Sequence, residues 1–88
     1  YIKRKMNICF FIGKIISDID FKFMVNDKKN IAITIFKLKV NENCILTVKG
    51  YNNLADLCYR NLSINNYIII QGELDSKMEV ILYSIELF

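Results

Sequence analysis

The residues of this chain whose chemistry suits a ligand are lysines and aromatic side chains on two neighbouring predicted strands. Cations that follow a phosphate backbone, mixed with flat rings on which bases stack, are what binding of single-stranded nucleic acid requires. Residues 31–40 and 44–49 have the alternation of strands, so one face of each points outward. The candidate binding residues on and beside this face are Lys14, Lys22, Thr34, Phe36, Lys37, Lys39, Thr47, Lys49 and Tyr51.

A structural role for the same side chains also fits the pattern. Phe36 can pack under a loop, and Tyr51, just after a glycine, can cap a helix. Lysines on strands also serve as solubilising residues that keep sheet edges from pairing with other chains. The sequence leaves both interpretations open for these residues.

Catalytic chemistry is not indicated anywhere in the chain. There is no histidine, the carboxylates are scattered, and the three glycines form no phosphate-binding loop. The three cysteines, Cys9, Cys44 and Cys58, lack a C-x-x-C spacing and supply too few soft ligands for a zinc site. We therefore predict a protein that is not an enzyme and has no catalytic residues, bound metal or cofactor.

Length and charge are consistent with a single small domain that offers one face to a polyanion. The 88 residues carry a net charge of +3, and residues 1–60 hold eleven Lys/Arg against five Asp/Glu. Residues 61–88 hold one lysine against four acids. We predict one domain over residues 1–88, with residues 1–5 as an N-terminal extension and Met6 as a natural first residue.

The stretch from residue 45 to residue 74 organises the predicted fold. It reads as a strand ending at Gly50, a short amphipathic helix with Asn52 or Asn53 as its N-cap, and a second strand ending at Leu74. Predicted strands at residues 7–16, 21–25 and 31–40 precede it, and one at residues 78–88 follows. The expected architecture is all-β: a five-stranded OB-fold Greek-key barrel with one short helix between strands three and four.

Two strands have irregular patterns. The strand at residues 7–16 is apolar on both faces, which predicts that one face packs on a second copy of the chain through Ile8, Cys9 and Phe11. In the strand at residues 31–40 the apolar alternation changes phase near Phe36, which predicts either a bulge at that point or a strand that leaves the barrel wall.

The N-terminus needs separate consideration, because Lys3, Arg4 and Lys5 precede an apolar run, as in a secretory signal. Gly13 and Lys14 interrupt that run, and no cleavage site follows. No segment has the roughly 20 apolar residues of a membrane span. We expect a cytoplasmic protein without membrane association, whose cysteines stay reduced.

In their order and spacing, several segments resemble those of the bacterial single-stranded DNA-binding protein family. Asn7 with the apolar strand and Gly13 resembles the family's opening strand, and residues 31–35 resemble its second strand. The most specific similarity lies in residues 48–56 and 67–74, whose key residues are Val48, Lys49, Gly50, Leu54, Ala55, Asp56, Gln71, Gly72, Glu73 and Leu74. The similarity covers nearly the whole chain.

This resemblance implies an OB barrel that pairs through its first strand and binds single-stranded DNA across strands two and three. The chain departs from the family in three ways. Asn43 and Lys49 stand where stacking aromatic rings are expected, two hairpins are short, and the 88 residues include no acidic tail segment. The shortened barrel is also similar to the primosomal replication proteins of the same superfamily, which act in DNA replication.

Two functions from different classes follow. The first is a sequence-independent single-stranded DNA-binding module, a homodimer or homotetramer, for which RNA remains a possible ligand. The second is an OB-fold protein-interaction or assembly module that has lost DNA binding. Binding to an oligonucleotide that weakens with salt distinguishes them.

Overall fold

The computed structural model describes residues 8–88, apart from the side chain of Asn26. The expected extension at residues 1–5 and the expected strand start at Asn7 lie outside the described residues. Residues 8–88 form six strands and one helix, in the order β1 (Cys9–Ile15), β2 (Asp20–Asn26), β3 (Lys29–Asn41), β4 (Cys44–Tyr51), α1 (Asn53–Asn61), β5 (Tyr67–Leu74) and β6 (Val80–Leu87).

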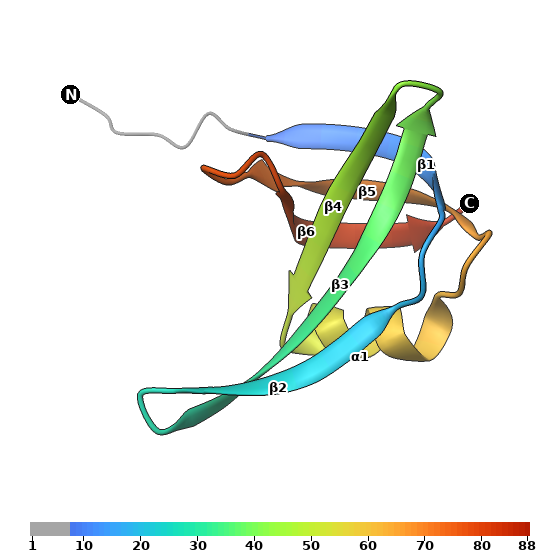
Figure 1. The fold of residues 1–88 in the computed structure, drawn as a ribbon. Helices are drawn as coiled ribbons and strands as arrows, with labels where there is room; N and C mark the ends of the chain where they lie inside the picture. The colour runs from blue at the N-terminus through green and yellow to red at the C-terminus, as the bar shows by residue number, and fades with distance from the viewer. Residues whose placement is uncertain (1–7) are drawn as a thin grey trace.

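The strands form one curved sheet that closes on itself (Figure 1). Their order is β1-β5-β6-β4-β3-β2, and an additional pairing of β1 with β3, at Lys14 with Lys39 and Ile15 with Leu38, closes the barrel. All ladders are antiparallel except β4 with β6. The predicted five-stranded OB-fold barrel with one helix between its third and fourth strands is confirmed.

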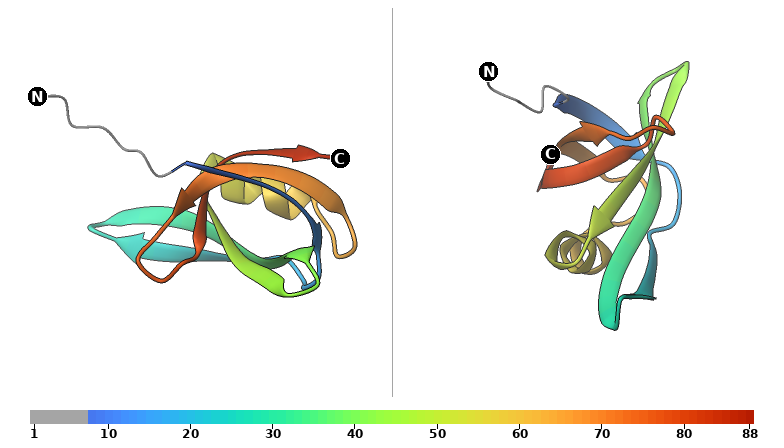
Figure 2. Two further views of the ribbon diagram at one scale, coloured as in Figure 1. Left: turned by 90° about the horizontal axis from the view of Figure 1, so that it is seen from above. Right: turned by 90° about the vertical axis from the view of Figure 1, so that its left-hand side faces the viewer.

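The additional strand is β2, which follows β1 after a bend at residues 16–19. It pairs along its whole length with β3, from Asp20 opposite Ile35 to Asn26 opposite Lys29. The resulting β2–β3 hairpin projects beyond the rest of the barrel, as both views of Figure 2 show. Residues 21–25, predicted as a strand or a strand extension, are thus an extension of the barrel wall.

The core lies inside the barrel, and α1 covers one end of it. Its fully buried side chains include Phe36, Ile15 and Leu38, with Ala55 and Cys58 from the helix. Asn52 lies at the N-cap position, but its side chain makes no capping hydrogen bond. Its backbone N–H instead donates to the Ala32 carbonyl at 2.8 Å, so the helix start is fixed by β3.

Glycine is required at residue 13, where β1 crosses β3. A Cβ built on Gly13 would lie 2.7 Å from the Lys39 carbonyl oxygen and 2.9 Å from Leu38 Cγ. Any side chain would therefore separate the two strands at the ladder that closes the barrel.

Of the two explanations for the phase change near Phe36, the bulge is wrong, whereas a strand that leaves the barrel wall agrees with the projecting β2–β3 hairpin (Figure 2). The β3–β4 register runs without interruption from Ile33 opposite Tyr51 to Lys39 opposite Ile45, and its irregularity lies between Lys39 and Asn41. The apparent phase change arises because Ile33 and Thr34 are both buried, although they point to opposite faces of β3. Because the outer face of β3 also carries apolar residues here, the sequence looked as if the inward-facing apolar residues changed from one parity to the other.

Candidate nucleic-acid interface

Five lysines lie on one outer face of the barrel, which we call the lysine face: Lys14, Lys22, Lys37, Lys39 and Lys49. They come from four strands, and the ladder register brings them together. Residues directly opposite each other in a ladder point to the same side, so Lys14 and Lys39 share a face, as do Lys37 and Thr47. Alternation along β3 and β4 then adds Lys49, and the pairing of β2 with β3 adds Lys22, which lies opposite the outward-pointing Ile33.

One end of the lysine face combines two cations with an aromatic ring. Tyr67 lies opposite Lys14, and Lys14 lies opposite Lys39, so the three side chains form a row across β5, β1 and β3. The Tyr67 side chain is exposed, and the three residues line one hollow of about 340 Å³. Tyr67 was not predicted, because the sequence does not reveal which residue of β5 faces Lys14.

The middle of the face is formed by Lys37 and Thr47. The Lys37 ammonium donates to Thr47 Oγ1 at 2.6 Å, and the Lys37 backbone N–H donates to Ser17 Oγ at 2.8 Å. The backbone bond holds the strand against the bend at residues 16–19. Lys37 itself is exposed, so its ammonium group is accessible to a phosphate.

Lys49, next along the face, is engaged by an acid. Its Nζ lies 2.6 Å from Glu79 Oε1, and the two side chains are only 20% and 24% exposed. The hydrogen bond to Glu79 raises the pKa of Lys49 above its ordinary value, against the opposing effect of burial, and the charge of Asp75 acts in the same direction as Glu79. Lys49 is therefore a cation whose charge is already compensated.

The far end of the face carries Lys22 and Tyr51 on either side of Ile33. Lys22 is exposed, and the Tyr51 side chain is partly open to solvent, at 37%. With Tyr67 at the opposite end, the lysine face thus has one accessible tyrosine ring at each of its ends. Exposed rings of this kind provide stacking platforms for bases.

Carboxylates also lie on this face and reduce its positive charge. Lys39 pairs with the exposed Glu42 at 3.4 Å, Lys49 pairs with Glu79, and Asp20 lies opposite Ile35 on the same side. The ion pair at Glu42 is open to solvent and weak. The face is therefore cationic, but less so than its five lysines alone indicate.

Two predicted binding residues lie in the interior, and their assignment to the outer face was wrong. Phe36 is 1% exposed and belongs to the core, while Thr34 is fully buried and its hydroxyl donates to the Asp20 carbonyl at 2.7 Å. Even-numbered residues of β3 point inward from Thr34 to Leu38, so neither side chain reaches a ligand on the outer face.

The predicted oligomer contact is divided between the two faces of β1. Ile8 is exposed, together with Phe10 and Ile12 on the same face, whereas Cys9 and Phe11 pack against the core. The Cys9 thiol donates to the Gly72 carbonyl at 3.4 Å, and burial raises its pKa despite that bond. The apolar surface of β1 is therefore the strip Ile8, Phe10 and Ile12, which we call the β1 strip.

A second aromatic group lies on the opposite face of the β2–β3 hairpin. The ring of Phe21 contacts Phe23 edge-on at 5.3 Å between centroids and lies 4.8 Å from the ring of Tyr59 on α1. These contacts fasten the helix to the hairpin. They explain the packing of β2 and add nothing to the lysine face.

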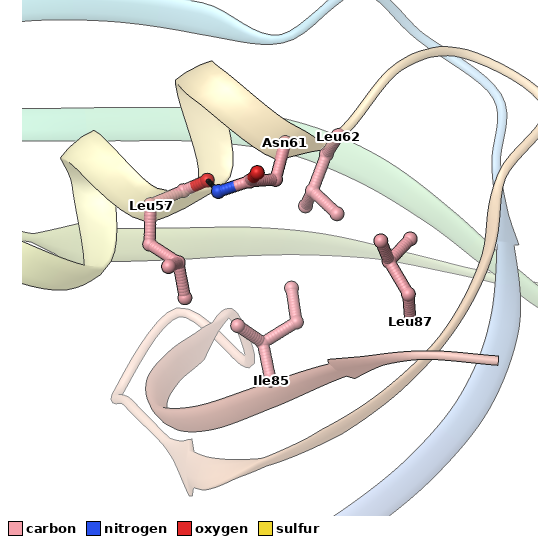
Figure 3. A pocket seen from close by; sticks show the side chains of 5 residues that line it. All are labelled: Leu57, Asn61, Leu62, Ile85 and Leu87. Atoms are coloured by element: carbon pink, nitrogen blue, oxygen red, sulfur yellow. Dashed lines mark hydrogen bonds between the residues drawn. The ribbon is translucent and has the colours of Figure 1, made fainter.

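An apolar groove lies between α1 and β6, and its lining contains no ionisable side chain that could take part in catalysis (Figure 3). It has a volume of about 270 Å³ and is lined by Leu57, Asn61, Leu62, Ile85 and Leu87. Its single polar side chain, the Asn61 amide, donates to the Leu57 carbonyl at 2.9 Å.

Within residues 8–88, no three His, Cys, Asp or Glu side chains gather as a metal site, and no helix is suited to crossing a membrane.

Solved structures share this fold. An SSB domain from Synechococcus sp. matches with a TM-score of 0.83 at 15% identity, over 96% of this chain and 98% of that one. A deletion variant of the single-stranded DNA-binding protein from Thermus aquaticus matches with a TM-score of 0.79 at 20% identity, over 94% of this chain and 41% of that one. No protein-family model and no curated protein matches. The likeness shows that this chain has the fold of SSB domains.

Proposed function

We propose that this protein binds single-stranded DNA without sequence preference, across the lysine face. The observation that supports the proposal most is the cross-strand alignment of Lys14, Lys37 and Lys39 between two accessible tyrosine rings. The Thermus aquaticus structure with this fold is that of a single-stranded DNA-binding protein, which supports the proposed ligand. Binding, rather than catalysis, is the role that these residue types support.

The mechanism combines two contacts that ignore base identity. Ammonium groups of the lysine face neutralise phosphates and release their counterions, which favours binding and makes it sensitive to salt. Bases stack on Tyr51 and Tyr67, and each stacked base contributes about 1–3 kcal/mol. With two such rings, the affinity of one barrel is modest, and assembly of several barrels on one strand increases it.

The test is a fluorescence-anisotropy titration with a labelled poly-T oligonucleotide at low and moderate salt, beside the matching duplex. Binding should be saturable, weaker in salt and much poorer for duplex. Lys22→Glu with Lys37→Glu, two exposed positions, should abolish it. The matched control is Lys28→Glu with Lys77→Glu, which changes the charge equally at two turns outside the lysine face. Equal loss in both double variants contradicts the proposed face.

We also propose that the barrel self-associates through the β1 strip, as a homodimer or homotetramer. Beside β1, the residues Phe10, Ile12 and Ile69 line an open hollow of about 540 Å³. Burying three large apolar side chains provides the driving force. Sedimentation of Phe10→Ser with Ile12→Ser should give the monomer mass, whereas the wild-type protein should give two or four times that mass.

The competing function is an assembly module without nucleic-acid binding. The observation that favours it is the pairing of Lys39 and Lys49 with acids, together with the exposed β1 strip. It predicts self-association without salt-sensitive binding to poly-T. A parallel titration with poly-U decides between DNA and RNA as the ligand.

Because Cys9, Cys44 and Cys58 are all free thiols, we place the protein in the reducing cytoplasm.

A further inference from the structure

We propose that Glu79 closes a phosphate subsite at Lys49, and that a phosphate of the bound strand opens it by replacing the Glu79 carboxylate. The inference rests on the proposed function and makes Glu79 the residue that sets its affinity. Lys49 then contributes little to binding in the wild-type protein, although it lies in the middle of the lysine face.

The carboxylate is held in place by the turn between β5 and β6. Asp75 Oδ1 accepts from the backbone N–H groups of Lys77 and Glu79, each at 2.9 Å, and the Asp75 N–H donates to the Glu79 carbonyl at 2.9 Å. Met78 adopts a positive φ of 62° within this turn. These bonds fix the backbone of Glu79 independently of its side chain.

The strand pairing directs the Glu79 side chain to Lys49. Val80 lies beside Val48, and Ile81 lies beside Lys49 in the parallel β4–β6 ladder. Side chains alternate along each strand, so Val80 and Val48 point inward, and Glu79 shares the outer face with Lys49. Ile35 and Ile81 flank Lys49 on the neighbouring strands and limit the access of water to the ion pair.

A phosphodiester is a natural replacement for this carboxylate, because both carry one negative charge and accept hydrogen bonds from an ammonium group. When a phosphate replaces the carboxylate, Lys49 gains a contact with the phosphate and loses its contact with Glu79. The charged Glu79 carboxylate then remains near the incoming phosphate. Lys49 therefore yields little net affinity while Glu79 is ionised. Removing the carboxylate changes this, since Lys49 is then balanced by the more distant charge of Asp75 and by mobile counterions, and binding releases those counterions.

The experiment measures poly-T affinity at several salt concentrations for four proteins besides the wild type: Glu79→Gln, Glu86→Gln, Lys49→Ala and the double variant Lys49→Ala with Glu79→Gln. Glutamine keeps the shape of Glu79 and leaves the backbone bonds of the turn intact. Glu86→Gln makes the same charge change on β6, at an exposed position that lies opposite Ile69 and two strands away from Lys14. Thermal unfolding establishes that every variant is folded.

We expect Glu79→Gln to bind about tenfold more tightly than Glu86→Gln, as one additional charge-assisted contact provides. Its salt dependence should steepen by about 0.7, the value for one further phosphate on a single strand. Lys49→Ala should change wild-type affinity less than about twofold, but should cancel the whole gain of Glu79→Gln. This non-additivity is the signature of a closed subsite.

Two results overturn the inference while leaving the proposed function intact. One is equal affinity of Glu79→Gln and Glu86→Gln for poly-T. That result would show that the gain in affinity comes from the change in net charge and not from the Lys49 subsite. The other is a large loss in Lys49→Ala alone, which shows that Lys49 already binds phosphate beside Glu79. Absence of binding by every variant overturns the proposed function and this inference together. Binding by Glu79→Gln alone supports closure of the subsite.

Discussion

Lys14 of β1 lies directly opposite Lys39 of β3, so the ladder that closes the barrel places two lysine side chains at opposed positions on its outer surface. Like charges at opposed positions of a ladder destabilise it. Glu42, an exposed residue of the following turn, compensates Lys39 only weakly. The barrel therefore closes against a repulsion that a bound polyanion relieves.

Lys14→Thr should consequently stabilise the free protein and weaken its binding to poly-T. We expect a gain of about 0.5 kcal/mol in the free energy of unfolding at low salt, which added salt removes by screening. Urea denaturation at two salt concentrations measures it. Lys22→Thr is the control, because Lys22 faces Ile33 rather than a cation, and it should show no gain. A similar gain in both variants would contradict repulsion as the cause.

Substitutions of Phe36 and Tyr51 should affect different properties: the stability of the fold for Phe36, and the affinity for poly-T for Tyr51. Phe36→Ala should lower the free energy of unfolding by about 3–5 kcal/mol, a large part of the total for a small domain. Tyr51→Ala should leave stability nearly unchanged and reduce affinity by about 1–3 kcal/mol. Denaturation and anisotropy on the same samples measure both quantities. Phe36→Leu is the control, since a folded core without the ring should bind normally.

Tyr67 should act as a stacking platform at the other end of the lysine face. We expect Tyr67→Ala to reduce poly-T affinity by about 1–3 kcal/mol, and Tyr67→Phe to retain it, because stacking needs the ring and not the hydroxyl. Tyr83→Ala on β6 removes a comparably exposed ring and serves as the control. Equal affinity of Tyr67→Ala and wild type would remove Tyr67 from the site.

The thiol of Cys58 should give the fold a dependence on alkaline pH. Burial raises its pKa to about 11, from an ordinary value of 9.0. The folded state holds this proton more tightly than the unfolded state, so the contribution is complete below pH 9 and is lost as pH rises toward 11. A rise of about two units in the pKa corresponds to a contribution of at most about 3 kcal/mol to the free energy of unfolding.

The measurement is the free energy of unfolding of wild type and Cys58→Ala between pH 8 and pH 11. Lysines and tyrosines titrate in both proteins, and therefore the difference between the two isolates Cys58. That difference should be constant near pH 8 and shrink above pH 9, as the wild type loses its pH-dependent contribution. A constant difference across the range would show that folding does not raise the pKa of Cys58 above its value in the unfolded chain.

The fold could be predicted from the sequence because its signals are local. Turn residues such as Asn41 and Asp75 bound the strands, and the spacing of Leu54, Cys58 and Leu62 identifies the helix. The order of these elements then leaves few topologies, of which the OB barrel is one. The error at Phe36 came from β3, where buried side chains on both faces hide the alternation.

The site was only partly predictable, because it depends on registers between distant strands. Lys37, Lys39 and Lys49 are visible as outward residues of one hairpin. Tyr67 and Glu79 are not, since their positions depend on how β5 meets β1 and how β6 runs beside β4. No local pattern encodes these pairings, and loop closure over long separations has no sequence signature.

The long sequence separation between β1 and its main partner β5 has a consequence for synthesis on the ribosome. Its longest ladder joins Cys9 to Gly72 and Lys14 to Tyr67, so β1 stays without its main partner until β5 has been translated. During that interval its apolar side chains are exposed in an incomplete chain, where they attract other unfolded segments. Pairing over such separations also slows folding, to milliseconds or longer in barrels of this kind. Nascent chains that end before residue 67 should accordingly depend on chaperones more than chains that include β5.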